Sequence, residues 1–374
     1  MGISISLGGS TPTLPKLEMR DAEIADHVAG RVLFTLPLSA ASSDAQRIAG
    51  AAGVTIIEQV PLDQMAVLMV IAALAPGDTT DQTMARLRQQ RGVDLVQPDY
   101  LFQSLAGSSR SKGFALHGIP DIDRTPVTGT IAMIDTSVQR AHANLTDSNI
   151  QQFFFGVSPS PSAHGTAIAE LLVGKGNFPG TAPGAQLISL AAFAPAAESS
   201  WLSQTSYLAR AMNKALALRP NVLNLSFGRS GTDPLMARAL DLMQQKGVCV
   251  VAAAGNGSGK PVLFPATHPA SLAVTAVDSK LRAYPHASLG QQISVAAWGV
   301  DLSAAVPGGR RAVSGTSFAT AVVSGALLRT AECNGGGNPA GMKQRMMAQA
   351  RDLGTAGRDP VFGAGLFVLA AQKK

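Results

Sequence analysis

The 374-residue sequence has few charged residues, few aromatic residues and only two cysteines. Charged residues make up 14% of the chain while hydrophobic residues make up 46%, a balance that excludes a disordered or fibrous protein. No apolar run reaches the length of a membrane span. The formal charge is +6, but the lysines and arginines are scattered rather than arranged in a stripe, so we expect no nucleic-acid partner.

What the sequence does contain is 38 glycines and much alanine, which suits a buried parallel sheet with tight turns. Its length allows one large domain and a smaller one. Residues 1–27 contain no apolar stretch flanked by basic residues, so no signal peptide is visible. Either a signal has been removed from this sequence or the protein stays inside the cell, and the sequence leaves both open.

A serine at the start of a helix is the first candidate for a reactive group. The stretch from Ala312 to Thr330 predicts a helix that begins near Ser317, after Gly315 and Thr316. Such a serine commonly caps the free N–H groups of the first turn. It also lies where those N–H groups favour an oxyanion. A serine is a weak nucleophile until a base takes its proton, so a histidine and a group that orients it are also required.

One of the six histidines and one aspartate have the surroundings that these roles need. His164 follows a Pro/Ser-rich loop and precedes the apolar run from Ile168 to Val173, which predicts a position at the start of a buried helix. Asp135 ends a short apolar strand, and α/β sheets present functional groups at the ends of strands. An aspartate after a strand is equally often a turn or capping residue.

Asn256 follows another buried strand, Val248 to Ala253, through the small residues Ala254 and Gly255. Alone it would be read as a turn residue. As a neutral donor beside the serine and the histidine, it is predicted to stabilise the negative oxygen of a tetrahedral intermediate.

Taken together, these motifs resemble the subtilisin-like serine proteases (subtilases). The order Asp135, His164, Asn256, Ser317 is that of the family. The His-Gly-Thr block at His164 and the Gly-Thr-Ser block at Ser317 are specific to it, and Asn224 to Gly228 looks like its substrate-binding strand. The resemblance covers roughly Gly113 to the C-terminus.

The resemblance implies a serine endopeptidase that cleaves peptide or protein substrates through an acyl-enzyme. The implied triad is Asp135, His164 and Ser317, with Asn256 in the oxyanion hole. The implied substrate-binding residues are Leu225, Ser226, Phe227 and Gly228 on one edge, and Ala253, Ala254 and Gly255 as a wall of a pocket for a bulky apolar side chain.

The chain departs from the family pattern at two places. Ser137 stands where a glycine commonly follows the catalytic aspartate, and Ala321-Val322-Val323 stands where many members have proline and histidine. Neither place supplies a triad atom, so the departures concern packing and not the chemistry.

Hydrophobic periodicity predicts the order βαββαβ for the N-terminal part, a ferredoxin-like α+β unit. The expected elements are strand Arg31–Leu36, helix Ser43–Ala52, strands Val54–Gln59 and Met65–Ala72, helix Thr79–Arg91 capped by Thr80 or Asp81, and strand Val93–Phe102. Before a subtilase domain, this unit resembles the family's inhibitory propeptide, whose C-terminal tail lies in the active-site cleft. An unrelated small domain is the alternative.

The expected organisation has four parts. Residues 1–29 form a flexible segment, 30–104 the propeptide-like domain, 105–113 a linker, and 114–374 the catalytic domain, with processing between Phe102 and Gly113. Alternating strands and helices in the last part predict an α/β fold, a subtilisin-like parallel sheet with helices on both faces. The expected elements are strands Ile131–Ile134, Gln186–Ala191, Val222–Leu225, Val248–Ala253 and Leu272–Val277, and helices Thr166–Val173, Leu202–Leu218, Pro234–Gln245 and Pro339–Ala350.

The cysteines and the acidic residues do not indicate a further site. Cys249 lies in an apolar strand and is expected to be a buried, inert thiol, while Cys333 is expected in a loop, so we do not predict a bridge between them. No cluster of histidines, cysteines and carboxylates has the spacing of a catalytic metal site. Catalysis is expected to need no cofactor. Structural calcium, common in the family, is compatible with the sequence but is not predicted, because the loop from Lys175 to Gly180 is short.

Three other functions remain open at this point. A pseudoenzyme could keep the fold as a binding module, although the complete triad argues against it. The related acid-active sedolisins replace the base histidine with a carboxylate, so His164 argues against them. An enzyme that stays locked by its own propeptide is compatible with the sequence. The resemblance implies a secreted or periplasmic protein, and a cytoplasmic location stays open because no signal peptide is visible.

Overall fold

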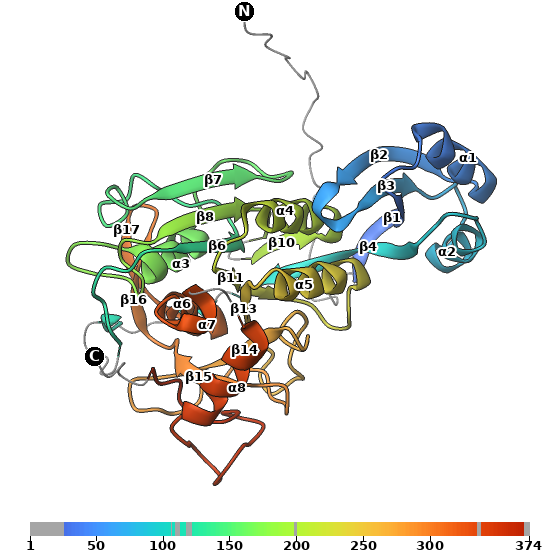
Figure 1. Cartoon of the computed structure of the whole chain (residues 1–374). Helices are drawn as coiled ribbons and strands as arrows, with labels where there is room; N and C mark the ends of the chain where they lie inside the picture. Colours follow the sequence, from blue (N-terminus) through green and yellow to red (C-terminus); the bar gives the residue numbers. More distant parts are fainter. Residues whose placement is uncertain are drawn as a thin grey trace, which may run out of the picture.

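The computed structural model describes residues 26–105, 107–108, 113–116, 122–197, 200–334 and 338–369. Within these residues a parallel sheet of seven strands forms the centre of the larger part of the molecule (Figure 1). Its strand order is β15-β14-β13-β11-β6-β8-β7, with every neighbouring pair parallel. The strands are Val295–Trp298 (β15), Ser271–Val277 (β14), Cys249–Ala253 (β13), Val222–Leu225 (β11), Thr130–Asp135 (β6), Gln186–Ala191 (β8) and Ile150–Phe154 (β7).

Helices cover both faces of this sheet. Buried apolar side chains of β6 point alternately to the two faces, so both faces need a covering layer. Ile131 and Met133 face one core, which is shared with helices α3 (Ala163–Val173) and α6 (Thr316–Leu327). Ala132 and Ile134 face the other core, which is shared with α4 (Thr205–Leu218) and α5 (Pro234–Gln245). This arrangement confirms the expected α/β class with a parallel sheet and helices on both faces.

A smaller four-stranded unit precedes the large sheet in the chain. Its elements occur in the order βαββαβ, and its strand order is β2-β3-β1-β4. The elements are β1 (His27–Pro37), α1 (Ser42–Ala52), β2 (Thr55–Leu62), β3 (Val67–Ala73), α2 (Thr80–Arg88) and β4 (Leu95–Ser104), with a 3-10 turn, Asp63–Met65, between β2 and β3. Thr79 caps α2 through its hydroxyl, so the cap is neither Thr80 nor Asp81, the residues expected from the sequence.

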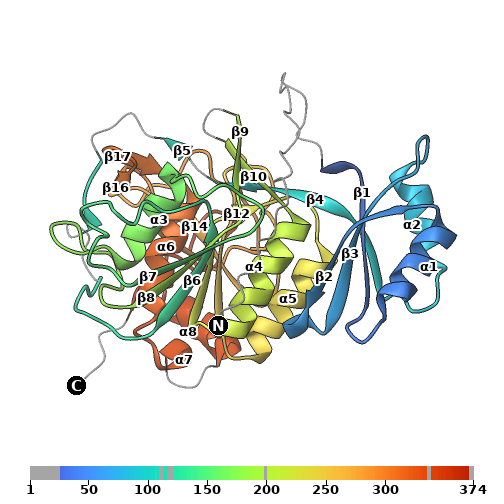
Figure 2. The same cartoon turned by 90° about the horizontal axis from the view of Figure 1, so that it is seen from above.

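The two faces of this small sheet have different partners. Val32 and Phe34 of β1 pack against α1 and α2, whereas Leu33 belongs to the core that also holds α4 and α5. Figure 2 shows the small sheet between its own two helices on one side and α4 and α5 on the other. The small unit is therefore docked through the face that its own helices leave open.

Strand β4 links the small unit to the large one. Its first half pairs with β1, and its last residues pair with β10 (Ser200–Gln204) on one side and with β12 (Phe227–Gly228) on the other. Strand β9 (Ala194–Ala197) extends this arrangement beyond β10. Residues 202–204 were expected to begin a helix, and that prediction was wrong: they form a strand because β4 supplies an antiparallel partner, and α4 begins only at Thr205.

A second small sheet lies beside the start of α6. Strands β16 (Leu302–Val306) and β17 (Gly309–Ser314) form a hairpin, and β17 also pairs with β5 (Gly107–Ser108). This hairpin is not among the elements expected from the sequence.

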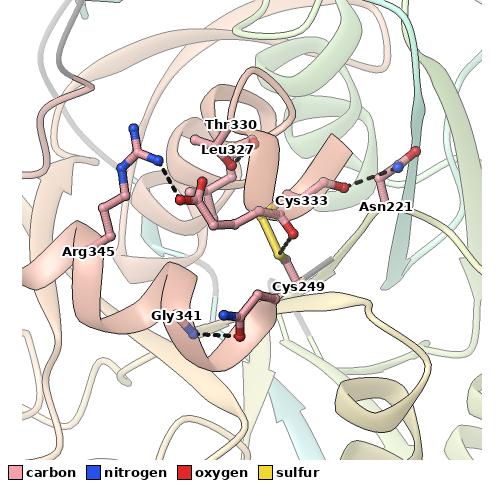
Figure 3. The surroundings of a disulfide bond; sticks show 9 residues. Asn221, Cys249, Leu327, Thr330, Cys333, Gly341 and Arg345 are labelled. Atoms are coloured by element: carbon pink, nitrogen blue, oxygen red, sulfur yellow. Dashed lines mark hydrogen bonds and ion pairs between the residues drawn. A yellow bond between two sulfur atoms is a disulfide. The ribbon is translucent and has the colours of Figure 1, made fainter. Parts of the chain in front are cut away.

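The two cysteines form a disulfide bond, contrary to our expectation from the sequence. Cys249 begins β13 and Cys333 lies in the short helix α7 (Ala331–Asn334), with their Cα atoms 5.7 Å apart (Figure 3). Asn221 holds the same junction, because its side chain donates to the Cys333 carbonyl at 3.1 Å and accepts from Thr130 N at 2.8 Å. The bridge was missed because the cysteines are 84 residues apart, and only the packing of α7 over β13 brings them together.

Helix α8 (Pro339–Gln349) follows, close to the expected bounds. Among the described residues, no helix is both long enough and apolar enough to cross a membrane.

Candidate active site

Asp135 and His164 are in direct contact at the carboxyl end of strand β6, in the middle of the large sheet. Asp135 is the last residue of β6, His164 lies in the first turn of α3, and 2.7 Å separates Asp135 Oδ1 from His164 Nδ1. Both side chains are almost completely buried. Thr136 donates to the same carboxylate oxygen from its backbone N at 2.6 Å and from its hydroxyl at 3.1 Å. These donors hold the carboxylate in position to orient the imidazole.

The residue after His164 shows why this contact needs glycine. A Cβ atom on Gly165 would lie 2.3 Å from the carbonyl oxygen of Thr136. The close approach also lets the Gly165 N–H donate to the Thr136 hydroxyl at 2.8 Å. The helix start therefore approaches the end of β6 closely enough for the histidine to reach the aspartate.

Ser317 lies in the first turn of α6, where the serine was expected. Its Oγ is 2.7 Å from the carbonyl oxygen of Leu105 and 3.1 Å from that of Ser226. His164 Nε2 is buried and has no hydrogen-bond partner among the residues that the structure describes. The histidine ring lies against the ring of Phe318, with 5.5 Å between centroids. The site thus holds a serine hydroxyl bonded to two backbone carbonyls and, in the described part of the chain, an imidazole nitrogen without a hydrogen-bond partner.

Asn256 completes the group and its amide orientation is defined by its neighbours. Its Oδ1 accepts from Thr316 N at 3.1 Å and from the Thr316 hydroxyl at 3.0 Å. Its Nδ2 donates to the Leu105 carbonyl oxygen at 2.8 Å. Thr316 is in turn fixed, because its hydroxyl accepts from Gly255 N at 3.2 Å. The amide N–H group therefore points at the same oxygen as the serine hydroxyl.

The chain's own segment Leu101 to Leu105 lies across this site as an extended strand. Leu202, Ser203 and Gln204 of β10 pair with it on one side, while Phe227 and Gly228 of β12 pair on the other. The Leu105 N–H donates to the Ser226 carbonyl at 3.2 Å. On the far side of Leu105, Gly107 and Ser108 pair with Ser314 and Val313. A peptide is thus held on both sides of the bond that joins Leu105 to Ala106.

The substrate-binding residues expected from the sequence have different positions. Phe227 and Gly228 pair with β4, and the Ser226 carbonyl accepts from Leu105, whereas Leu225 belongs to β11 and is fully buried in the large sheet. Ala253 ends β13, and Ala254 and Gly255 lead from it to Asn256. Their part in a side-chain pocket stays a prediction.

Sequence reasoning missed four contributors to the site. Strand β10 was hidden in a stretch with helical periodicity, and Thr136 and Thr316 gave no signal beyond their place in the motifs. Leu105 was assigned to a linker, although it follows directly on the strand that ends at Ser104. In the described part of the chain, no three histidine, cysteine or acidic side chains are grouped closely enough to hold a metal ion.

A parallel α/β sheet that carries an aspartate, a histidine and a helix-start serine in this chain order is typical of the subtilisin-like class of proteins, whereas α/β-hydrolases have the order serine, aspartate, histidine. The fold of fervidolysin from Fervidobacterium pennivorans, a keratinolytic enzyme related to subtilisin, matches this structure with a TM-score of 0.76 and 23% identity. That match covers 94% of this chain and 61% of fervidolysin, and it bears on the fold alone.

Sequence comparison gives the family. Residues 128–365 match the profile of the subtilase family. The chain is 27% identical over 295 residues to subtilisin NAT of Bacillus subtilis subsp. natto, which covers 74% of this chain and 75% of that protein. It is 31% identical over 221 residues to the minor extracellular protease Epr of Bacillus subtilis (strain 168), covering 56% of this chain but only a third (33%) of Epr. The chain belongs to the subtilase family, which consists of subtilisin-like serine proteases.

Proposed function

We propose that this chain is a serine endopeptidase that uses Asp135, His164 and Ser317 as its triad and Asn256 in its oxyanion hole. One observation carries the proposal: the carbonyl oxygen of Leu105 lies 2.7 Å from Ser317 Oγ and 2.8 Å from Asn256 Nδ2. A carbonyl held between a nucleophile and an amide donor is the arrangement that acyl transfer requires.

The proposed reaction uses these groups in turn. His164 Nε2 takes the proton of Ser317 as Oγ forms a bond to the carbonyl carbon, and the oxygen becomes negative beside Asn256 Nδ2. Asp135 stabilises the imidazolium through Nδ1. When the C–N bond breaks, His164 gives the proton to the leaving amine. Water attacks the acyl-enzyme with the same base and restores Ser317. No step needs a cofactor.

We also propose that residues 30–104 act as an inhibitory propeptide and that the chain cleaves itself. Residues at the end of β4 fill the cleft that a substrate would occupy. Two side chains of β4 also reach helices of the large part: Asp99 accepts from Ser206 N at 3.0 Å at the start of α4, and Gln97 accepts from Leu235 N at 3.0 Å at the start of α5. Both satisfy N–H groups that a helix start leaves free.

Mass and N-terminal sequencing of the purified chain test this proposal. We expect a nicked protein whose larger piece begins at Ala106, because the Leu105 carbonyl is the one aligned with Ser317 and Asn256. Leu105→Pro should block this cut, since proline lacks the N–H that bonds to Ser226. A new N-terminus elsewhere would reject the cut at Leu105. A wild-type chain that stays whole and hydrolyses no peptide would favour a binding module instead.

The affinity of the two cleaved pieces should depend on pH through Asp99. Burial raises the pKa of Asp99 from its usual 3.8 to about 6, against the opposing effects of the Ser206 donors and of Arg31. The docked form holds this proton more tightly than the separated pieces do. Docking is therefore strongest below pH 3.8 and weakens as the pH rises through 6. From pH 5 to pH 7.5 we therefore expect about a tenfold loss of affinity from this group alone.

Gel filtration of the nicked protein at several dilutions measures that affinity. Asp99→Asn keeps the shape and an acceptor for Ser206 but cannot ionise, so the part of the pH dependence that comes from Asp99 should disappear. A part should remain from Asp233, because burial in the same interface also raises the pKa of that carboxyl. Tighter docking at the higher pH, or an unchanged slope in Asp99→Asn, would contradict the assignment.

We further propose a secreted or periplasmic location. Subtilase relatives are mostly secreted, and the Cys249–Cys333 disulfide belongs to an oxidising compartment rather than to a reducing cytoplasm. Peptides or proteins are the proposed partners.

A further inference from the structure

Arg229 lies next to strand β4, the strand that runs into the site, but takes no part in the chemistry described above. It follows Gly228 of β12, and its backbone pairs with Phe264 through N–H to O distances of 2.9 and 3.0 Å. Its side chain is 5% exposed. Its guanidinium carbon lies 4.0 Å from the ring centroid of Tyr100 and 5.9 Å from that of Phe102.

Two aromatic residues of β4 lie near this guanidinium because of the geometry of the strand. Side chains two positions apart in a strand point to the same face, so Tyr100 and Phe102 lie on one side of β4. Counting back from the Leu105–Ala106 bond, they are the sixth and the fourth residues. Phe102 is almost fully buried against Phe227 and Phe264, while the Tyr100 ring has Arg229 over its face.

The guanidinium has polar contacts in both parts of the molecule. Nη1 donates to the Thr232 carbonyl at 3.1 Å, and the backbone bonds to Phe264 fix the Cα position. Nη2 pairs with Asp26, whose carbonyl also accepts from Leu101 N at 2.9 Å. Asp26 and Tyr100 leave together when the N-terminal piece departs, whereas Thr232 and Phe264 remain. The departure exposes the face of a guanidinium that keeps its hydrogen bond to Thr232 and its backbone bonds to Phe264.

We propose that Arg229 forms a remote substrate subsite that selects an aromatic residue at the sixth position before the cleaved bond. This inference rests on the proposed protease function. A guanidinium over an aromatic face is attracted by the electrons of the ring, and the attraction is larger where water is excluded. An aliphatic side chain of the same size offers the contact area without that attraction.

Four peptides with the sequence of residues 100–107 test the subsite. The first residue is tyrosine, phenylalanine, cyclohexylalanine or alanine, and kcat/KM is measured with the self-cleaved wild-type enzyme. We expect tyrosine and phenylalanine to be equal, and cyclohexylalanine and alanine to be lower by about three- to tenfold. In Arg229→Gln the four values should converge. Equal values in the wild type, or cyclohexylalanine as good as phenylalanine, would overturn the subsite.

A second measurement does not depend on catalysis. In the unprocessed Ser317→Ala chain, Tyr100 is part of the same polypeptide, so thermal unfolding of Tyr100→Leu, Arg229→Gln and the double variant gives a coupling between the two side chains. We expect the double variant to lose less than the sum of the single losses. Strict additivity would overturn the contact. Failure of every peptide to be cleaved, with the coupling intact, would reject the protease function while keeping the recognition of the ring by Arg229.

Discussion

Replacing Ser317 by alanine should lower kcat for peptide hydrolysis by about 10⁶-fold, the size of the loss for the same change in subtilisin, and should leave the chain whole. The hydroxyl oxygen is the only atom removed, and it is the one that lies 2.7 Å from the Leu105 carbonyl oxygen. Without it, His164 has no nucleophile to activate. Hydrolysis assays and the intact mass of the purified chain measure the two effects together.

Ser324→Ala is the matched control. Ser324 lies in the same helix, is also fully buried, and donates to Asn224 Oδ1 at 3.0 Å, away from the Leu105 carbonyl. This variant should lose about 1 kcal/mol of stability and keep its activity. Hydrolysis that survives in Ser317→Ala at the wild-type rate would remove Ser317 from the mechanism.

Asn256→Ala should lower kcat by a factor of about 10² to 10³ and change KM little, a magnitude known for the oxyanion amide of subtilisin. The reason is that the amide N–H, 2.8 Å from the Leu105 oxygen, gains strength as that oxygen becomes negative. Steady-state kinetics with a single peptide separate the two constants.

Asn256→Asp separates the donor from the rest of the side chain. The carboxylate keeps an acceptor for Thr316 N and its hydroxyl, but it has no N–H and carries a negative charge toward the oxyanion. Its loss of kcat should therefore be at least as large as that of alanine. A normal kcat in either variant would assign the oxyanion to other donors.

Much of the fold was predictable because the spacing of hydrophobic residues and the local capping residues indicated the same elements. Strands Gln186–Ala191 and Val222–Leu225 and helix Pro234–Gln245 were predicted with their observed bounds. The last of these begins with Pro234 after the cap Asp233, which accepts from Met236 N at 3.0 Å. Such signals lie within a few residues and need no tertiary partner.

Predictions failed where a distant segment decided the local structure. Residues 202–204 have helical spacing but form a strand, because β4 offers them unpaired backbone groups. The Cys249–Cys333 bridge depends in the same way on α7 packing over the start of β13. Local propensity differs between states by less than the hydrogen bonds of a new strand, so the long-range partner prevails.

The sequence by itself determined the family, the parallel α/β sheet and the four residues proposed for catalysis, since each of these is carried by short blocks in a characteristic order. Only the tertiary structure decided that Leu105 lies at Ser317 and Asn256, that β10 forms the second edge of the cleft, and that Arg229 covers Tyr100. These contacts join segments roughly a hundred residues or more apart. Their geometry follows from the docking of one sheet on α4 and α5, which no local pattern encodes.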